Sequence, residues 1–249
     1  MENVLRELEH DYNIEILFAC EAGSHVWGSS SEDSDLDLRF IYKQKDLRSY
    51  LSLEKLIDVI EINNEIDIHG WDIQKALQLL RKSNPTLYEW AFSPVVYFEK
   101  NSFSEKLKQM IMNHYSPYSL VMHYIHLMAR NIKEVKGCHT FNLKRQKQLI
   151  QAVKSVLICH NFFVSHSIRS PFFLSDILQS QTTNPFAKSY RQLVEAKIMN
   201  KVVPNHFYVD LLDRLEIEKV SLLEKVNELG RGNDCKDQLN EWLWELLNI

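Results

Sequence analysis

The apolar periodicity of the chain changes near residue 100. Before this point short β-rich runs alternate with short helical segments, and after it the apolar positions follow the 3.6-residue period of helices. About five strands are expected, at 14–20, 35–42, 57–62, 65–71 and 95–98. Helices are expected around 103–113, 117–135, 143–163, 174–179, 186–199, 206–229 and 235–247. The pattern therefore predicts an α+β protein, with a mixed-sheet domain at 1–100 and an all-α domain at 101–249.

The composition indicates a soluble globular protein of ordinary charge. Hydrophobic residues make up 45% of the 249 residues, and the formal net charge of -4 argues against a generally cationic nucleic-acid binder. The N-terminus lacks the pattern of a signal peptide, and no apolar run approaches the roughly 18 residues that span a bilayer. The cysteines lie far apart without zinc-ligand spacing, at 20, 138, 159 and 235. We expect a cytoplasmic protein with reduced thiols and no membrane partner.

The strand expected at 35–42 carries two carboxylates at its start. Asp35 and Asp37 are two residues apart, so in a strand they point to the same face. Two like charges this close are unfavourable without a cation. Arg39 follows on the same face, where it could assist a phosphate or neutralise the acidic pair. Taken by itself, Asp-x-Asp is also common in solvated turns.

The Gly23-Ser24 pair directly follows the buried run at 14–20. Glycine lets backbone amides approach a phosphate closely, and a following turn or helix start adds amide dipoles and a hydroxyl. Magnesium prefers oxygen ligands and is commonly held by one or two carboxylates together with substrate phosphates. The two motifs together predict a site where phosphate and Mg²⁺ meet, and two ions there would suit in-line displacement at phosphorus.

Gly-Ser, ten residues and then Asp-x-Asp resembles the signature of the DNA polymerase beta nucleotidyltransferase superfamily. Wider motifs at 21–28, 33–42, 67–72 and 82–90 resemble the predicted nucleotidyltransferases of the YcgL and RNA-ligase-associated (RlaP-like) group. The likeness is close over 12–98 and looser through the helical half. It implies a nucleotidyltransferase catalytic domain at 1–100 that transfers a nucleoside monophosphate from a nucleoside triphosphate to a hydroxyl acceptor, with RNA as one candidate acceptor.

The resemblance also implies a third carboxylate on a neighbouring strand. Asp67 is the best-placed candidate, and it would join Asp35 and Asp37 in holding two Mg²⁺ ions, with Mn²⁺ as a substitute. Asp72 is the rival, although it precedes a helical run and suits an N-cap. The catalytic and metal-binding residues expected are therefore Asp35, Asp37 and Asp67.

The nucleotide-binding residues implied by the family motifs are Gly23, Ser24, His25, Arg39, Asn84 and Glu89. Asn84 precedes Pro85 and is equally suited to helix punctuation. Family members commonly carry Arg where this chain has His25. Arginine is always charged, whereas the charge of histidine depends on pH, so His25 is the weaker group for binding a triphosphate. The alternative function is therefore a catalytically weak nucleotide- or RNA-binding module on the same fold.

The helical half contains one local excess of basic residues. Between 130 and 154 seven Lys and Arg side chains face a single Glu, Glu134. This stretch could contact triphosphate or an RNA acceptor, or it could be a solvated helix face. The sequence leaves the acceptor, the preferred nucleotide and the oligomeric state open.

Overall fold

The computed structural model describes residues 1–30, 35–64, 66–137, 140–166 and 174–249. Its contacts divide the chain into two compact units. Unit 1 comprises Met1–Val26, Asp35–Ser116 and Gly232–Ile249, and unit 2 comprises Trp27–Ser34 and Pro117–Arg231. The sheet-containing unit thus takes in residues beyond 100 and the C-terminal helix.

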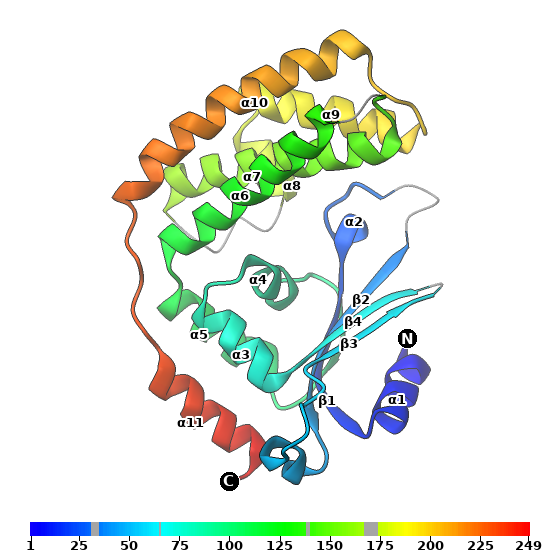
Figure 1. The fold of residues 1–249 in the computed structure, drawn as a ribbon, viewed down its shortest axis with the longest axis vertical. Helices are drawn as coiled ribbons and strands as arrows, with labels where there is room; N and C mark the ends of the chain where they lie inside the picture. The colour runs from blue at the N-terminus through cyan, green and yellow to red at the C-terminus, as the bar shows by residue number, and fades with distance from the viewer. Residues whose placement is uncertain (31–34, 65, 138–139, 167–173) are drawn as a thin grey trace. The chain divides into compact units, whose positions relative to one another are not determined.

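Unit 1 carries all the strands of the described residues. Its elements are α1 (Glu2–Asp11), β1 (Ile14–Ala22), α2 (Gly23–Val26), β2 (Leu36–Gln44), the 3-10 turn η1 (Leu47–Leu51), β3 (Val59–Asn63), β4 (Ile66–Asp72), α3 (Ile73–Arg81), α4 (Pro85–Ala91), β5 (Val96–Glu99), α5 (Phe103–His114) and α11 (Lys236–Leu247). The five strands form one sheet in the order β3-β4-β2-β1-β5 (Figure 1). Strands β2 and β4 run parallel and the other neighbours are antiparallel. The predicted mixed sheet is confirmed, and β3 and β4 form an antiparallel hairpin, of which Glu65 lies outside the described residues.

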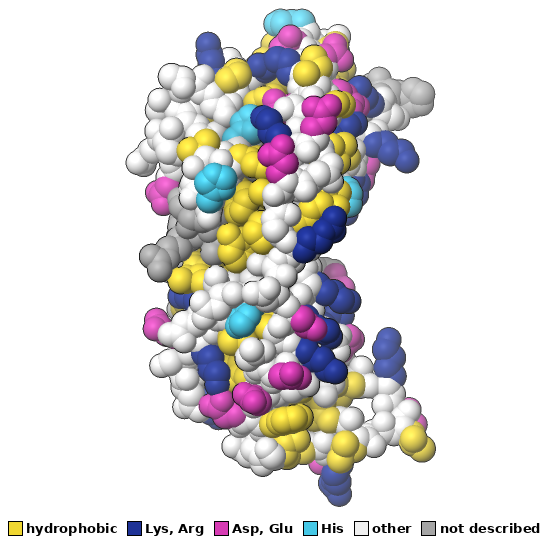
Figure 2. All heavy atoms as spheres, turned by 90° about the vertical axis from the view of Figure 1, so that its left-hand side faces the viewer, with side chains coloured by type: hydrophobic (Ala, Val, Ile, Leu, Met, Phe, Trp, Pro, Cys, Tyr) yellow, Lys and Arg dark blue, Asp and Glu magenta, His cyan; other side chains and the backbone are white. Residues whose placement is uncertain are grey.

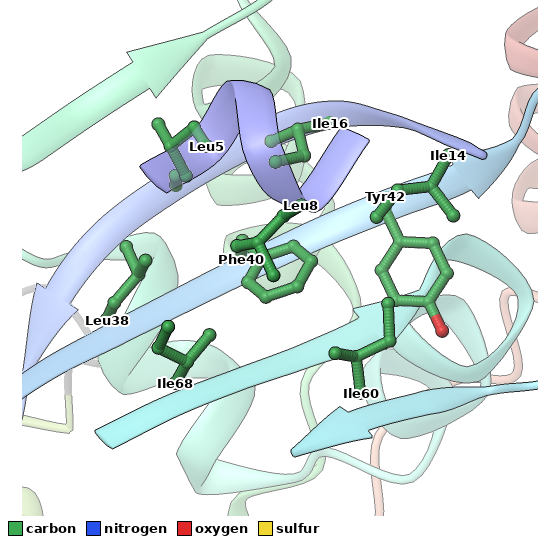
Figure 3. Packing of buried hydrophobic residues seen from close by; sticks show 10 residues of the cluster. Leu5, Leu8, Ile14, Ile16, Leu38, Phe40, Tyr42, Ile60 and Ile68 are labelled. Atoms are coloured by element: carbon green, nitrogen blue, oxygen red, sulfur yellow. The ribbon is translucent and has the colours of Figure 1, made fainter. Parts of the chain in front are cut away.

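Helix α1 covers one face of the sheet (Figure 1). Its Leu5 and Leu8 pack against apolar side chains of the strands, which are shown in Figure 3: Ile14, Ile16, Leu38, Phe40, Tyr42, Ile60 and Ile68. Gly70 belongs to this face, and a Cβ there would lie 2.1 Å from the Phe40 ring. The period-two pattern of β2 therefore gives one fully apolar face and leaves Asp37 and Arg39 for the other.

The opposite face packs against α3 and α4. Helix α3 begins at Asp72, whose carboxylate accepts a hydrogen bond from the Gln74 amide. On α4, Trp90 stacks on Trp71 of β4, with ring centroids 3.8 Å apart and planes inclined by 20°. Both indoles are largely buried. The two indoles cover the apolar part of this face of the sheet. The polar side chains of Asp37, Arg39 and Asp67 lie on the same face, outside the part that the indoles cover.

The regular secondary structure in the described residues of unit 2 is entirely helical. Its elements are α6 (Pro117–Lys136), α7 (Leu143–Ser165), α8 (Leu174–Ser180), α9 (Pro185–Ile198), α10 (Asn205–Lys225) and the 3-10 turn η2 (Val226–Glu228). Helix α7 is the central element, because it is buried on most of its circumference and packs against α6, α8, α9 and α10. The expected mostly helical C-terminal region is confirmed.

The surface carries charges of both signs. On the face drawn in Figure 2, basic and acidic side chains are intermingled rather than separated into fields. Across the described residues, no helix has the length and apolar character needed to span a membrane. Cys20, Cys159 and Cys235 are buried free thiols, and Cys138 lies outside the described residues.

Candidate active site

Asp37 and Asp67 lie side by side on the polar face of the sheet. Strands β2 and β4 pair in parallel with Asp37 directly opposite Asp67, so both side chains point to the same face. The side chains are 18% and 35% exposed, which leaves both carboxylates reachable from solvent. The structure thus brings together one member of the Asp-x-Asp pair and the carboxylate expected from the neighbouring strand.

Arg39 bridges these two carboxylates. Its Nη2 donates to Asp37 Oδ1 at 2.5 Å and to Asp67 Oδ2 at 2.8 Å, while Nη1 donates to the Asp67 backbone carbonyl at 2.7 Å. The guanidinium is only 14% exposed. Arg39 could bind a phosphate or neutralise the acidic pair, and its position between the two carboxylates matches neutralisation.

The two carboxylates differ in their readiness to ionise. Partial burial raises the pKa of Asp37, with help from the negative charges of Asp67 and Asp35, and Arg39 only partly opposes this. Burial also acts against ionisation of Asp67, but its hydrogen bond and charge contact with Arg39 outweigh this and hold its pKa below the ordinary value. The same arginine therefore lowers the pKa of Asp67 but does not offset the effect of burial on the pKa of Asp37.

The Gly23-Ser24 turn packs directly against Asp37. Gly23 has a φ of +71°, and a Cβ at this position would lie 1.7 Å from Asp37 Oδ2. Only glycine fits here, because the backbone conformation is left-handed and the carboxylate occupies the space of a side chain. Ser24 follows in the single turn of α2. The two sequence motifs meet at this contact.

Asp35 lies immediately before β2 and is exposed. Its charge contributes to the raised pKa of Asp37, which places it in the electrostatic neighbourhood of the pair. Asp33 and Ser34 of the same motif lie outside the described residues.

His25 is associated with Glu21. Its Nδ1 lies 4.0 Å from Glu21 Oε1, and Glu21 Oε2 accepts a hydrogen bond from the Tyr97 hydroxyl at 2.6 Å. In β1, Ala22 pairs with Asp37 and Glu21 pairs with Leu38, so Glu21 belongs to the apolar face rather than to the face of the acidic pair. The His25 imidazole therefore has an anionic neighbour distinct from the Asp37–Asp67 pair.

Asp72 and Asn84 both cap helices. Asp72 is fully buried, and it accepts from the Gln74 amide and the Tyr50 hydroxyl, each at 2.8 Å. Burial raises its pKa to about 6. Asp72 is five residues from Asp67, a distance of roughly 16 Å along an extended strand, and its side chain points to the opposite face of the sheet. Asp72 therefore cannot share a metal ion with Asp37.

The remaining nucleotide-binding candidates lie on α4. The Asn84 side-chain oxygen accepts from the amides of Thr86 at 2.9 Å and Leu87 at 3.2 Å, which is N-cap geometry. Glu89 is partly buried on the same helix, one residue before Trp90. The bonds of Asn84 are thus those of a helix cap, separate from the Asp37–Asp67 pair.

His69 is a site residue to which the sequence analysis assigned no role, although it lies within the motif at 67–72. It lies two residues after Asp67 on the same face and pairs in register with Arg39. Its Nε2 accepts a hydrogen bond from Trp71 Nε1 at 2.9 Å, which leaves the proton of the neutral ring on Nδ1. Burial, followed by the charge of Arg39, lowers its pKa. The i, i+2, i+4 spacing of Asp67, His69 and Trp71 was the signal available in the sequence.

The donor chemistry of the site fits magnesium. Asp37 and Asp67 offer carboxylate oxygens, which Mg²⁺ prefers, and a cationic nitrogen of Arg39 already lies between them. Within the described ranges, however, no three His, Cys, Asp or Glu side chains converge as a ready metal-binding group. The described arrangement is thus an acidic pair held by an arginine, with Asp35 nearby.

Comparisons of sequence and structure show which known proteins the chain is similar to. The family model described as "RNA repair pathway DNA polymerase beta family" (RlaP) matches residues 1–244. The uncharacterised protein YcgL of Bacillus subtilis is 31% identical over 244 residues, which cover 96% of this chain and 92% of that protein. A crystal structure of a nucleotidyltransferase-like protein from Exiguobacterium sibiricum aligns with 91% of this chain and 74% of its own, at 11% identity and a TM-score of 0.32.

Proposed function

Because the chain belongs to the RNA repair pathway DNA polymerase beta family, we propose that it is a metal-dependent nucleotidyltransferase. It would transfer a nucleoside monophosphate from a nucleoside triphosphate to a hydroxyl acceptor and release pyrophosphate. The contact of the Gly23-Ser24 turn with Asp37, directly beside Asp67, is the observation that carries the proposal. The family description favours RNA as the acceptor.

Asp37 and Asp67, together with Asp35, are the residues that would hold two Mg²⁺ ions, with Mn²⁺ as a replacement. When bound, these ions would supply the positive charge that offsets the triphosphate and the charge developing on the departing pyrophosphate. The acidic side chains are already aligned by the β2–β4 register, so little rearrangement of the backbone is required. Arg39 keeps the pair from repelling each other before the nucleotide arrives.

The turn at Gly23 and Ser24 would seat the triphosphate. The missing Cβ of Gly23 allows close approach of the backbone, and the Ser24 hydroxyl can donate to a phosphate oxygen. His25, in the same turn, can donate from its ring to a further phosphate oxygen. Positioning and electrostatics of this kind supply most of the rate in phosphoryl chemistry.

Asp67 is suited to accept the proton of the attacking hydroxyl, because Arg39 holds it in the ionised form. The acceptor oxygen forms a bond to the α-phosphorus as the bond from that phosphorus to the bridging oxygen breaks. Pyrophosphate leaves with the electron pair, and the hydroxyl proton passes to an Asp67 carboxylate oxygen. The products are the nucleotidylated acceptor and pyrophosphate.

The test measures pyrophosphate release and label transfer from α-labelled nucleoside triphosphates, with Mg²⁺ and single-stranded RNA or other hydroxyl acceptors. We expect Asp37→Asn and Asp67→Asn each to lower the rate by at least about a hundredfold. Asp72→Asn is the matched control, since Asn keeps the helix cap, and it should retain activity. Transfer by wild type that survives Asp37→Asn would contradict the proposal.

A second candidate is a nucleotide- or RNA-binding module without turnover. The bridging of both carboxylates by Arg39 and the presence of His25 favour it. Calorimetry distinguishes the two, because the module would bind nucleotide or RNA with no pyrophosphate release. Its binding would also be unaffected by Asp37→Asn.

A further inference from the structure

The described part of the segment that links the two site motifs is seated on unit 2. Trp27 packs under Lys154 of α7, whose Nζ lies 3.3 Å from the indole centroid. Ser29 is bound through its carbonyl by Lys197 Nζ and through its hydroxyl by Tyr190, both from α9. Residues 27–30 therefore follow the Gly23-Ser24 turn in the chain but are held by helices of unit 2.

Lys197 is an unusual anchor because it is a cation in a mostly buried position. Its residue is 9% exposed, and its described partner is a neutral carbonyl. Burial and then the positive charge of Lys147 lower its pKa, and no carboxylate opposes these effects. Two cations thus lie close together at this place without a compensating acid among the described residues.

Gln146 brings further lysines to the same surface. Its side chain is fully buried, and it donates to the carbonyls of Leu193 and Lys201 at 3.2 and 3.0 Å. It also accepts from the Val203 amide at 2.9 Å. These bonds hold the loop after α9, with Lys201, against the start of α7. Lys147 directly follows Gln146 in α7, so both lysines lie in the same region of unit 2.

The lysine surface consists of Lys144 and Lys147 of α7, Lys197 of α9 and Lys201 of the following loop. Lys144 and Lys147 share one side of α7, being three residues apart. None of the four forms an ion pair with a described residue, and all but Lys197 are exposed.

Two other cations of the basic stretch are paired with carboxylates. Arg145 pairs with Glu134 at 3.4 Å, and Lys136 pairs with Glu216 at 3.0 Å. These two pairs reduce the excess of positive charge predicted for residues 130–154, whereas Lys144 and Lys147 keep theirs and contribute it to the lysine surface.

We propose that the lysine surface binds the phosphate backbone of an RNA. Several exposed ammonium groups, spread over two helices and a loop, match a chain of phosphates better than one compact anion. Lysine is a point charge that contacts phosphates without reading bases, so binding is independent of sequence. Lys197 of this surface also holds Ser29, which follows the Gly23-Ser24 turn in the chain, and the RNA bound there would be the acceptor of the proposed nucleotidyl transfer. The inference rests on that proposed function for the role of the RNA, though not for its binding.

The experiment measures fluorescence anisotropy of a labelled single-stranded RNA of mixed sequence with the full chain. EDTA is present and nucleotide is absent, so binding is observed independently of transfer. The test variant replaces Lys144, Lys147 and Lys201 by Gln and leaves the anchor Lys197 intact. The control replaces three exposed, unpaired lysines elsewhere, Lys188, Lys225 and Lys236, and changes the net charge equally.

We expect the test variant to bind more weakly and with a lower salt dependence. Each phosphate contact on a single strand contributes about 0.7 to the slope of log affinity against log salt, so losing three should lower it by about 2. The control should keep the wild-type slope. Thermal unfolding by circular dichroism checks that both triple variants are folded.

Three results would overturn the inference. The first is that the wild-type chain does not bind RNA, which would leave transfer to another acceptor intact. The second is equal weakening in the test and control variants, which would indicate net charge rather than a site. The third is weaker binding of ATP by the test variant with unchanged RNA binding, which would assign the lysines to the phosphates of the nucleotide.

Discussion

Asp72→Asn tests whether Asp72 is a structural carboxylate rather than a member of the acidic site. Asp72 is fully buried, and burial raises its pKa from the ordinary 3.8 to about 6. Below about pH 4 the carboxyl is protonated in both the folded and the unfolded chain. As the pH rises through 6, the unfolded chain releases the proton more readily, so the folded chain loses stability.

The size of this loss follows from the difference in pKa. About two pH units at roughly 1.4 kcal/mol each correspond to about 3 kcal/mol of unfolding free energy, lost between about pH 4 and pH 7. The asparagine side chain of the variant does not ionise, and it still offers an oxygen to the Gln74 amide. The variant should therefore gain about 3 kcal/mol relative to wild type as the pH rises over this range.

Urea unfolding of both chains at a series of pH values from about 4 to 8 measures this difference. Tyr50→Phe is the companion variant, because the Tyr50 hydroxyl donates to Asp72 Oδ2 and lowers its pKa. Removing it should extend the loss of stability to higher pH. A difference between wild type and Asp72→Asn that stays constant across the range would refute the assignment of the raised pKa to Asp72.

Three further changes probe the acidic site. Gly23→Ala should abolish label transfer, because the added Cβ would displace Asp37. It should also lower the free energy of unfolding in urea by about 1–2 kcal/mol, because alanine is strained in the left-handed backbone conformation. An active variant would refute the close packing of Gly23 against Asp37. Arg39→Gln removes the cation between Asp37 and Asp67, so saturating Mg²⁺ should raise the melting temperature more than in wild type; equal shifts would contradict the bridging role. His25→Arg should tighten ATP binding in calorimetry at about pH 8, because arginine stays charged, and unchanged affinity would place residue 25 away from the phosphates.

Local patterns were enough to predict the elements of the fold. The alternation in β2 separated Leu38 and Phe40 from Asp37 and Arg39, and side-chain chemistry marked Asp72 as the cap of α3. These features depend on neighbours within a few residues, which is the range over which strand and helix periods act. The sequence also located the Gly23-Ser24 turn, because it follows a continuous apolar strand.

Local patterns could not predict long-range pairing, and Asp67 was proposed only from the family resemblance. Asp37 meets Asp67 because β2 pairs in parallel with β4, across thirty residues that include β3. Likewise, α11 returns to pack on α3 of unit 1, although its own period is indistinguishable from that of the helices before it. A local pattern predicts which face of a helix or strand is apolar, but it does not identify the element that packs on this face.

The charges of the site bear on how two metal ions could be accommodated. Three carboxylates and the Arg39 guanidinium leave a formal excess of two negative charges, which one divalent ion would balance. A second ion bound to the free protein would make the site cationic, with too few carboxylate oxygens for both ions. The triphosphate brings both further negative charge and further oxygen ligands. We therefore expect one ion to bind the free protein and the second to enter with the nucleotide, whose phosphates complete its coordination.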